Sequence, residues 1–195
     1  MFIAFACLVS GYLIGTFPTA LLVGRRRGVD PTRTGSGNPG ATNVARTAGR
    51  WAGAATLIGD LLKGVAAAAL GWAGGGQTLA AWCGLAAVVG HVLPLTRGMR
   101  GGKGVATGAG MAIVVAPLAT LVAAVAFAVT LAVSRTVSVG SVVGAAVLPV
   151  AAAALGTPAL VVVALGLCAV VVTVRHEKNI RRYFRGQEPR LGHSA

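Results

Sequence analysis

The sequence predicts an all-α polytopic membrane protein with seven transmembrane helices. Only 11% of the 195 residues are charged and the mean hydropathy is +0.79, whereas about a quarter of the residues of a soluble domain are charged. Apolar stretches of about twenty residues recur along the whole chain, and each is long enough to cross the ~30 Å hydrocarbon core as a helix. A proline and the placement of the basic residues then decide the number of helices.

Six apolar stretches are recognisable, at roughly 2–23, 51–73, 77–96, 105–133, 138–155 and 158–174. The fourth is too long for one ordinary span, and Pro117 near its middle removes a helical hydrogen bond. We therefore expect short broken helices near residues 105–133, one over about 105–116 and one over about 118–133. This division brings the number of spans to seven.

The basic residues decide the orientation. With seven spans, every Lys and Arg except Lys63 falls in segments on one side, which are 24–50, 96–104, 134–137 and the tail from Arg175. Because basic loops stay on the cytoplasmic side, we expect the N-terminus outside and the C-terminus in the cytoplasm. Arg25 follows the first stretch, which is therefore expected to be a retained helix and not a signal peptide. Loops that face anionic lipid explain the net charge of +13, so no nucleic-acid partner is expected.

Two of the cytoplasmic segments are rich in glycine. They contain GSGNPGAT, which begins at Gly35, and RGGKGVAT, which begins at Arg100. Glycine-rich backbone before a helix start, with a cation nearby, suits phosphate because N–H groups approach the oxygens and the helix dipole adds positive potential. Each motif alone is equally typical of turns at the ends of membrane helices. The second motif is not a Walker A loop, because Gly104 follows Lys103 where Ser or Thr is required.

Ionisable residues also occur inside a predicted span. Asp60 and Lys63 are one helical turn apart and can face each other. Such groups are candidates for function, and the alternative is a neutralised structural pair. In the cytoplasmic segments the carboxylates are limited to Asp30, Glu177 and Glu188. A carboxylate-built metal cage is therefore not expected, and the chemistry must depend on groups that stabilise anions.

The last polar segment follows the final apolar stretch. His176, Asn179 and Arg182 are spaced to share one face of a helix that continues from this span. His176 is a candidate proton acceptor or anion ligand. Near the start of the sixth span, Ser138 is expected to cap the helix, whereas Ser141 is expected to reach into a site.

Together the motifs resemble a known family. GSGNPGATNVAR (35–46), GHVLPLTRGMRGGKGVATG (90–108) and HEKNIRRYFRGQEP (176–189) are similar, in order and spacing, to the three signature loops of the bacterial acyl-phosphate-dependent glycerol-3-phosphate 1-acyltransferases. DLLKG at 60–64 and VSVGS at 137–141 extend the likeness over essentially the whole chain. One membrane acyltransferase domain over 1–195 is therefore expected.

The resemblance implies a multi-pass enzyme of the bacterial plasma membrane with its active site on the cytoplasmic side. It would transfer a fatty acyl group from acyl-phosphate to the sn-1 hydroxyl of glycerol 3-phosphate, giving lysophosphatidic acid in the first step of phospholipid biosynthesis. No cofactor or metal is implied, and a monomer in contact with membrane lipids is expected. An organic-anion or phosphate transporter is the alternative function, and a non-catalytic membrane scaffold is a further one.

Both substrates carry phosphate, so the site needs two neighbouring groups of cations and N–H donors. Lys103 and the backbone of Gly101 and Gly102 are expected to neutralise phosphate, and the proton acceptor is either His176 or the phosphate of the acyl donor. The expected catalytic residues are Ser36, Arg46, Lys103, Ser141, His176 and Asn179. The expected substrate-binding residues are Gly37, Asn38, Gly40, Thr42, Asn43, His91, Gly101, Gly102, Gly104 and Thr107.

Overall fold

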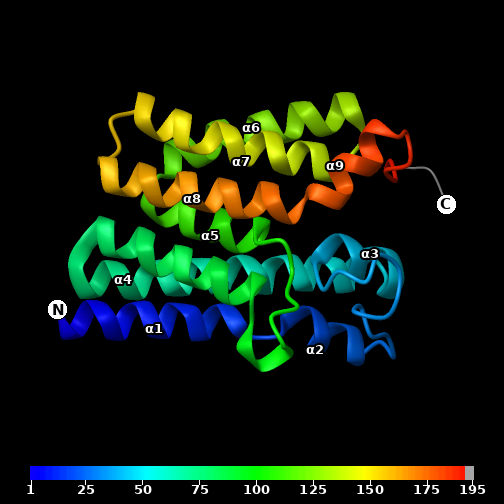
Figure 1. Ribbon diagram of the computed structural model, residues 1–195, viewed down its shortest axis with the longest axis horizontal. Helices are drawn as coiled ribbons and strands as arrows, with labels where there is room; N and C mark the ends of the chain where they lie inside the picture. Colours follow the sequence, from blue (N-terminus) through cyan, green and yellow to red (C-terminus); the bar gives the residue numbers. More distant parts are fainter. Residues whose placement is uncertain (192–195) are drawn as a thin grey trace. The chain divides into compact units, whose positions relative to one another are not determined.

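The computed structural model describes residues 1–191, and every regular element in this range is a helix (Figure 1). The chain divides into two compact units, Met1–Val115 and Ala116–Ala195. The first unit contains α1 (Phe2–Thr16), α2 (Thr19–Arg25), α3 (Ala41–Ala48), α4 (Arg50–Val92), the short helix η1 (Leu95–Arg97) and α5 (Val105–Val115). The second contains α6 (Pro117–Ser134), α7 (Val137–Ala154), α8 (Ala159–Arg175) and α9 (Glu177–Phe184). The predicted all-α class is confirmed for the described residues.

The first apolar stretch is two helices, not one. Helix α1 ends at Thr16 and α2 begins at Thr19, because Pro18 between them has no N–H to donate to the preceding turn. The predicted first span over 2–23 is therefore interrupted at this point, although Phe2–Arg25 together is long and apolar enough to cross a membrane. The break leaves carbonyl groups at the end of α1 without helical partners, and these become important in the site.

Helix α4 consists of two arms that reverse at Gly75 and Gly76. Both glycines have non-helical dihedral angles, and Gly76 has a positive φ of 76°. Gly71 lies against Ala80, so that a Cβ added at Gly71 would be 2.7 Å from the Ala80 Cα. Residues nine apart are about 13 Å from each other along a straight helix, so this approach requires a reversal. The predicted separate stretches over 51–73 and 77–96 correspond to these arms.

Small residues allow the helices of the first unit to approach closely. Gly64 on α4 lies against the backbone carbonyl of Thr107 on α5, and Gly15 on α1 lies against that of Ala87 on α4. In both places a Cβ would collide with backbone atoms. Close contact between backbones at small residues is the usual way in which helices associate in a membrane.

The fourth apolar stretch is divided as predicted. Helix α5 ends at Val115, and Pro117 occupies the first turn of α6, where a missing N–H costs nothing. One detail of the prediction is wrong: only α5 is short, with 11 residues, whereas α6 has 18. At the other end of the second unit, α9 bends away from α8 by 56°. The expected helix continuing from the last span is therefore a separate helix.

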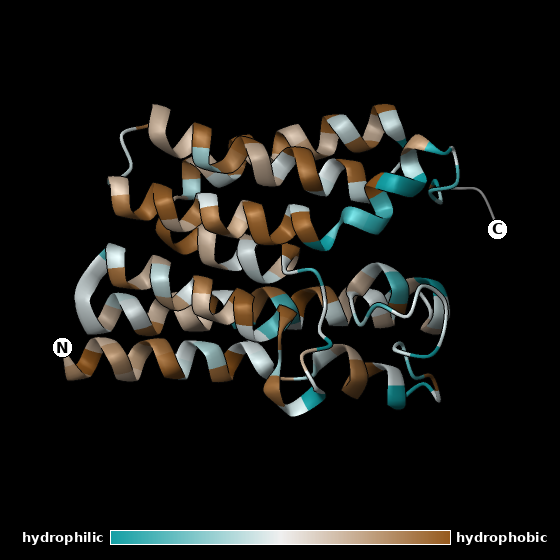
Figure 2. Cartoon of the chain, in the orientation of Figure 1, coloured by the Kyte–Doolittle hydropathy of each residue, from teal (hydrophilic) through white to brown (hydrophobic). Residues whose placement is uncertain are grey.

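The outer surfaces of both units are apolar along their helices. Leu118, Leu121 and Val129 on α6 are 66%, 62% and 59% exposed, as is typical of helices that contact lipid. Figure 2 shows hydrophilic residues gathered around α3 and its preceding loop in the first unit, and around α9 in the second. By length and composition, four helical stretches of the described chain can cross a membrane, or five if the bent pair α8 and α9 is one span.

Candidate active site

A buried asparagine holds the first glycine-rich loop in shape. The Asn43 side chain is 3% exposed, and its Oδ1 accepts a hydrogen bond from the Ser36 N–H at 2.9 Å. Its Nδ2 donates to the carbonyl oxygens of Pro31 at 2.9 Å and Thr34 at 3.0 Å. Because the amide is occupied by three backbone groups, Asn43 shapes the loop from α3 rather than presenting its amide to a ligand.

The glycines of this loop permit its tight turns. Gly35 and Gly37 have φ values of 60° and 69°, in the left-handed region that favours glycine. Gly40 has an extended backbone and is the N-cap of α3. Asn38 is half-buried beside Gly40, since a Cβ added at Gly40 would lie 2.8 Å from the Asn38 Nδ2.

The other polar residues predicted in this region are exposed. Ser36 lies in the loop, and Thr42 and Arg46 lie four residues apart on α3, so these two share one helix face. Their side chains are accessible, while Asn43 points inward. The first loop therefore combines a fixed backbone with exposed polar side chains.

The second glycine-rich loop, residues 93–104, folds back onto the end of α4. The N–H of Gly101 donates to the carbonyl of Val92, and the N–H of Gly102 donates to that of His91, both at 3.1 Å. The expectation that these two N–H groups face a phosphate is corrected, because both are used inside the chain. Their contribution is to hold the half-buried Lys103 next to the end of α4.

Helix α5 begins directly after this loop. Gly104 precedes it with a φ of 85°, which favours glycine. Thr107 lies in the first turn with no exposed surface, and its hydroxyl has no hydrogen-bond partner among residues 1–191. The first N–H groups of a helix have no intrahelical partners. This helix start therefore offers unused donors next to Lys103.

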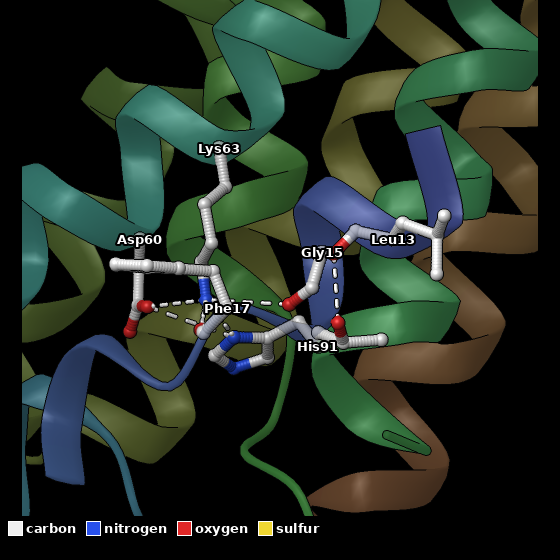
Figure 3. A network of polar contacts seen from close by, with 7 residues as sticks. Leu13, Gly15, Phe17, Asp60, Lys63 and His91 are labelled. Atoms are coloured by element: carbon white, nitrogen blue, oxygen red, sulfur yellow. Dashed lines mark hydrogen bonds and ion pairs between the residues drawn. The ribbon is translucent and has the colours of Figure 1, made fainter. Parts of the chain in front are cut away.

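Behind the loop, Asp60, Lys63 and His91 form a buried network (Figure 3). The Lys63 Nζ lies 2.8 Å from the Asp60 Oδ1 and 3.1 Å from the His91 Nδ1. All three residues are between 3% and 6% exposed. The sequence predicted the pairing of Asp60 and Lys63, but it placed His91 at the substrate and not in this network.

In the second unit, three side chains converge on the carboxylate of Glu188. Ser138 Oγ and Asn179 Nδ2 donate to its Oε1, and Arg182 Nε donates to its Oε2 at 2.8 Å. Burial alone would raise the pKa of this carboxyl, but the hydrogen bonds from Asn179, Ser138 and Arg182 outweigh burial and lower its pKa. The expected helix cap at Ser138 is wrong, because Thr136 is the N-cap of α7 and the Ser138 hydroxyl is bound to Glu188.

His176 lies at the bend between α8 and α9, and only 2% of its surface is exposed. Its Nδ1 is 2.8 Å from the carbonyl oxygen of Val172. A carbonyl only accepts hydrogen bonds, so Nδ1 carries a proton and the lone pair of the neutral ring is on Nε2. Ser141 is also buried, and its hydroxyl donates to the Val137 carbonyl at 2.9 Å.

The structure thus gathers the predicted residues into three groups. The first is the loop from Ser36 to Arg46, the second is the segment from His91 to Thr107, and the third is around His176 and Asn179. Glu188 was not predicted as a site residue, although it belongs to the quoted segment HEKNIRRYFRGQEP and is one of few carboxylates there. Among residues 1–191, no three His, Cys, Asp or Glu side chains are grouped so as to hold a metal ion.

Fold and site together define a helical membrane protein with two cationic, glycine-rich loops in its first unit. Residues 5–186 match the family described as glycerol-3-phosphate acyltransferase. The glycerol-3-phosphate acyltransferase of Geobacter sulfurreducens is 46% identical over 184 residues, which cover 92% of this chain and 93% of the relative. The chain belongs to the glycerol-3-phosphate acyltransferase family, and it is an integral membrane acyltransferase.

Solved structures agree with this assignment. The crystal structure of PlsY (YgiH), an integral membrane glycerol 3-phosphate acyltransferase, in its glycerol 3-phosphate form has a TM-score of 0.93 at 31% identity. That comparison covers 97% of this chain and 96% of PlsY. The lysophosphatidic acid form has a TM-score of 0.91, also at 31% identity, over 97% of this chain and 95% of PlsY.

Proposed function

We propose that this acyltransferase uses acyl-phosphate as its donor and acylates the sn-1 hydroxyl of glycerol 3-phosphate. The products are lysophosphatidic acid and inorganic phosphate, and the reaction is the first step of phospholipid biosynthesis. The related PlsY structures contain glycerol 3-phosphate and lysophosphatidic acid, which supports the same acceptor and product for this chain.

One observation carries the proposal: the first unit presents two glycine-rich loops, each leading into a helix start and each accompanied by a cation. The first has exposed Arg46 and Ser36 in front of a backbone fixed by Asn43. The second has Lys103 beside the start of α5, where the Thr107 hydroxyl is unpaired among the described residues. Two phosphate-bearing substrates require two phosphate-binding sites of this kind, because each phosphate dianion needs hydrogen-bond donors and positive charge around it.

We propose that residues 1–195 work as one acyltransferase domain and that polar residues of the second unit take part in the reaction. His176 between α8 and α9 and Asn179 on α9 supply polar groups, and Ser141 supplies a hydroxyl from α7. The Glu188 carboxylate accepts a hydrogen bond from the Asn179 amide and so fixes the position of this side chain. We propose that Asn43 fixes the shape of the first loop, that Glu188 fixes the position of Asn179, and that Ser36, Arg46, Lys103 and His176 contact the substrates.

The reaction needs no covalent enzyme intermediate. The sn-1 hydroxyl oxygen attacks the acyl carbonyl carbon, a new ester C–O bond forms, and the C–O bond to phosphate breaks. The hydroxyl proton passes either to the departing phosphate or to the lone pair on the His176 Nε2. Acyl-phosphate is an activated mixed anhydride, so positioning of the two reactants and neutralisation of their charge supply the catalysis.

The membrane arrangement follows from the same proposal. Counting the two arms of α4 separately, we infer seven spans in a bacterial plasma membrane, with the N-terminus outside and both loops on the cytoplasmic side. Helix α5 with its 11 residues is only about 17 Å long. The Lys103 loop therefore lies below the membrane surface, where a monomer can receive the acyl chain from the bilayer and glycerol 3-phosphate from the cytosol.

A donor comparison tests the proposal. The purified protein in proteoliposomes is given radiolabelled glycerol 3-phosphate with either palmitoyl-phosphate or palmitoyl-CoA, and labelled lipid is extracted. We expect lysophosphatidic acid with acyl-phosphate only, and carbon NMR of the product to show the ester at the sn-1 position. Faster synthesis from acyl-CoA, or uptake of label into the vesicles without lipid product, would overturn the proposal, and the second result would favour a transporter.

A variant tests the phosphate role of the second loop. Lys103→Ala is expected to lower kcat/KM by about 100-fold, as for the loss of one charged group at a transition state. Arg26→Ala removes an exposed cation from the end of α2 and serves as the matched control, with activity near that of the wild type. Normal turnover by Lys103→Ala in reconstituted membranes would exclude the proposed role.

A further inference from the structure

The network of Asp60, Lys63 and His91 is not used by the proposed reaction, although it is the most enclosed group of charges in the first unit (Figure 3). The side chains of Asp60 and Lys63 are 4% and 6% exposed. Burying charges in a membrane span is costly, and such groups are retained mainly for function or for specific structural tasks. The contacts of Lys63 indicate which task this network performs.

Lys63 joins three parts of the first unit that are distant in sequence. Besides Asp60 and His91 on α4, its Nζ donates to the carbonyl of Phe17 at 3.0 Å and lies 3.4 Å from that of Gly15. Both carbonyls are at the end of α1, where Pro18 interrupts the helix. An ammonium group here satisfies the helix-terminal carbonyls and is favoured by the helix dipole.

The contact with Lys63 decides which ring nitrogen of His91 carries a proton, because a protonated lysine can only donate hydrogen bonds. A protonated lysine has three N–H groups and no acceptor, and its closest neighbours are the Asp60 Oδ1, the Phe17 oxygen and the His91 Nδ1. The His91 Nδ1 therefore accepts a hydrogen bond and carries no proton. The proton of the neutral ring is then on Nε2.

The Nε2 edge of His91 lies against the second glycine-rich loop. A Cβ added at Gly102 would collide with the His91 Nε2, and the Gly102 N–H is bonded to the carbonyl of the same histidine. The next residue is Lys103. The N–H of His91 is thus directed at the loop segment that carries the proposed phosphate-binding cation.

Tyr12 attaches the beginning of the same loop to α1. Its hydroxyl donates to the Leu93 carbonyl at 2.9 Å and accepts from the Leu95 N–H at 3.1 Å. Helix α1 therefore contacts this loop at its start through Tyr12, and contacts its end through Lys63 and His91. A shift at the end of α1 would be transmitted to Lys103 by these contacts.

We propose that Lys63 is a positioning residue for glycerol 3-phosphate: it ties the end of α1 to Asp60 and fixes His91 with its Nε2–H toward Gly102, which holds the Lys103 loop in place. The proposal rests on the proposed phosphate-binding function of that loop, with glycerol 3-phosphate as the substrate that Lys103 binds. Lys63 does not touch substrate, and its removal should weaken substrate binding by displacing the loop.

The test uses a charge-neutral pair of substitutions. Lys63→Met alone leaves Asp60 buried and unpaired, so we combine it with Asp60→Asn to remove both charges. We expect the double variant to raise the KM for glycerol 3-phosphate by about tenfold, with a smaller change in kcat, because the loop is misplaced. Leu165→Ala, which creates a cavity in the buried part of α8, is the control that lowers the thermal stability without this change in KM.

Substitutions of His91 provide a second measurement that leaves the Asp60 and Lys63 pair intact. Glutamine places an N–H near the position of the ring Nε2, whereas asparagine reaches only the position of Nδ1. We expect His91→Gln to keep a KM closer to that of the wild type than His91→Asn. Equal KM values for these two variants, or a folded double variant with wild-type KM, would overturn the proposal.

A binding measurement separates this inference from the proposed function. Glycerol 3-phosphate should raise the midpoint of thermal unfolding of the wild type, and the double variant should need about tenfold more ligand for the same shift. If the wild type binds in this way but forms no lysophosphatidic acid from acyl-phosphate, the proposed donor is wrong and the positioning role stands. If both proteins respond equally to ligand, the positioning role is wrong.

Discussion

Replacing Glu188 by glutamine should destabilise the second unit and slow catalysis together. The carboxylate is 6% exposed and accepts hydrogen bonds from Ser138, Asn179 and Arg182. The amide of Glu188→Gln has only one oxygen, which can keep Ser138 and Asn179 as donors but turns its own NH2 toward the Arg182 Nε. One charge-assisted bond is lost, and the other two lose the charge of their acceptor.

The magnitude follows from these bonds. A hydrogen bond to a charged group contributes about 1.5–3 kcal/mol, but the Arg182 side chain is 40% exposed and can turn toward water, which lowers the cost of losing its bond. We estimate a total of about 2–3 kcal/mol, which corresponds to a fall of about 5–10 °C in Tm for a chain of this size. Because Asn179 loses part of its support, kcat should fall by about tenfold.

Thermal unfolding in detergent and initial rates of lysophosphatidic acid formation measure both effects. Glu177→Gln is the matched control, because Glu177 makes an exposed ion pair with Arg181 at 2.6 Å, and such surface pairs contribute only about 0.3–0.5 kcal/mol. A Tm for Glu188→Gln equal to that of the control, together with unchanged kcat, would refute the reasoning.

The pH dependence of the same carboxylate gives a second readout with a definite sign. The pKa of Glu188 is lower in the folded protein than its usual value of 4.5. A lowered pKa means that the folded state favours the carboxylate, so its contribution to stability is complete above about pH 4.5 and is lost as the pH falls through the folded-state pKa. The difference in Tm between wild type and Glu188→Gln should therefore shrink below this pH.

Three further predictions use local features of the fold. Gly64→Ala places a Cβ on the Thr107 carbonyl and should cost about 1–3 kcal/mol by forcing α4 and α5 apart, whereas Gly166→Ala on α8 meets no atom within 4 Å and should leave Tm unchanged or slightly raised. Asn43→Ala removes three hydrogen bonds from the first loop and should raise the KM for acyl-phosphate about tenfold in initial-rate assays. Tyr12→Phe loses both bonds to the second loop and should raise the KM for glycerol 3-phosphate about threefold, without lowering the yield of membrane-inserted protein.

The sequence predicts those features that depend on local spacing. The division between α5 and α6 was predictable because Pro117 lies in a stretch too long for one span. The pairing of Asp60 and Lys63 was predictable because residues three apart share a helix face. The interruption at Pro18 was not predicted, because the apolar stretch around it has the length of an ordinary span, so the helix-breaking effect of this proline was not taken into account.

Contacts between distant residues were beyond such reasoning. Ser138 and Glu188 are 50 residues apart, and Lys63 and His91 are 28 apart. Nothing in the spacing of one segment specifies its partner in another, so Ser138 was assigned to a cap and His91 to the substrate. Only the packing of the helices reveals that their polar groups are used by other parts of the chain.

These long-range contacts separate the polar residues into two kinds with different consequences. Asn43, Lys63 and Glu188 are enclosed, and their side-chain bonds are made to the protein itself, so they act by fixing where a loop or a side chain lies. Ser36 and Arg46 are exposed on a backbone that is already fixed. Substitutions of the enclosed group should therefore change thermal stability and enzyme kinetics together, whereas substitutions of the exposed group should change the kinetics alone. A substitution of Arg46 that lowered Tm as much as Glu188→Gln does would show that this separation is wrong.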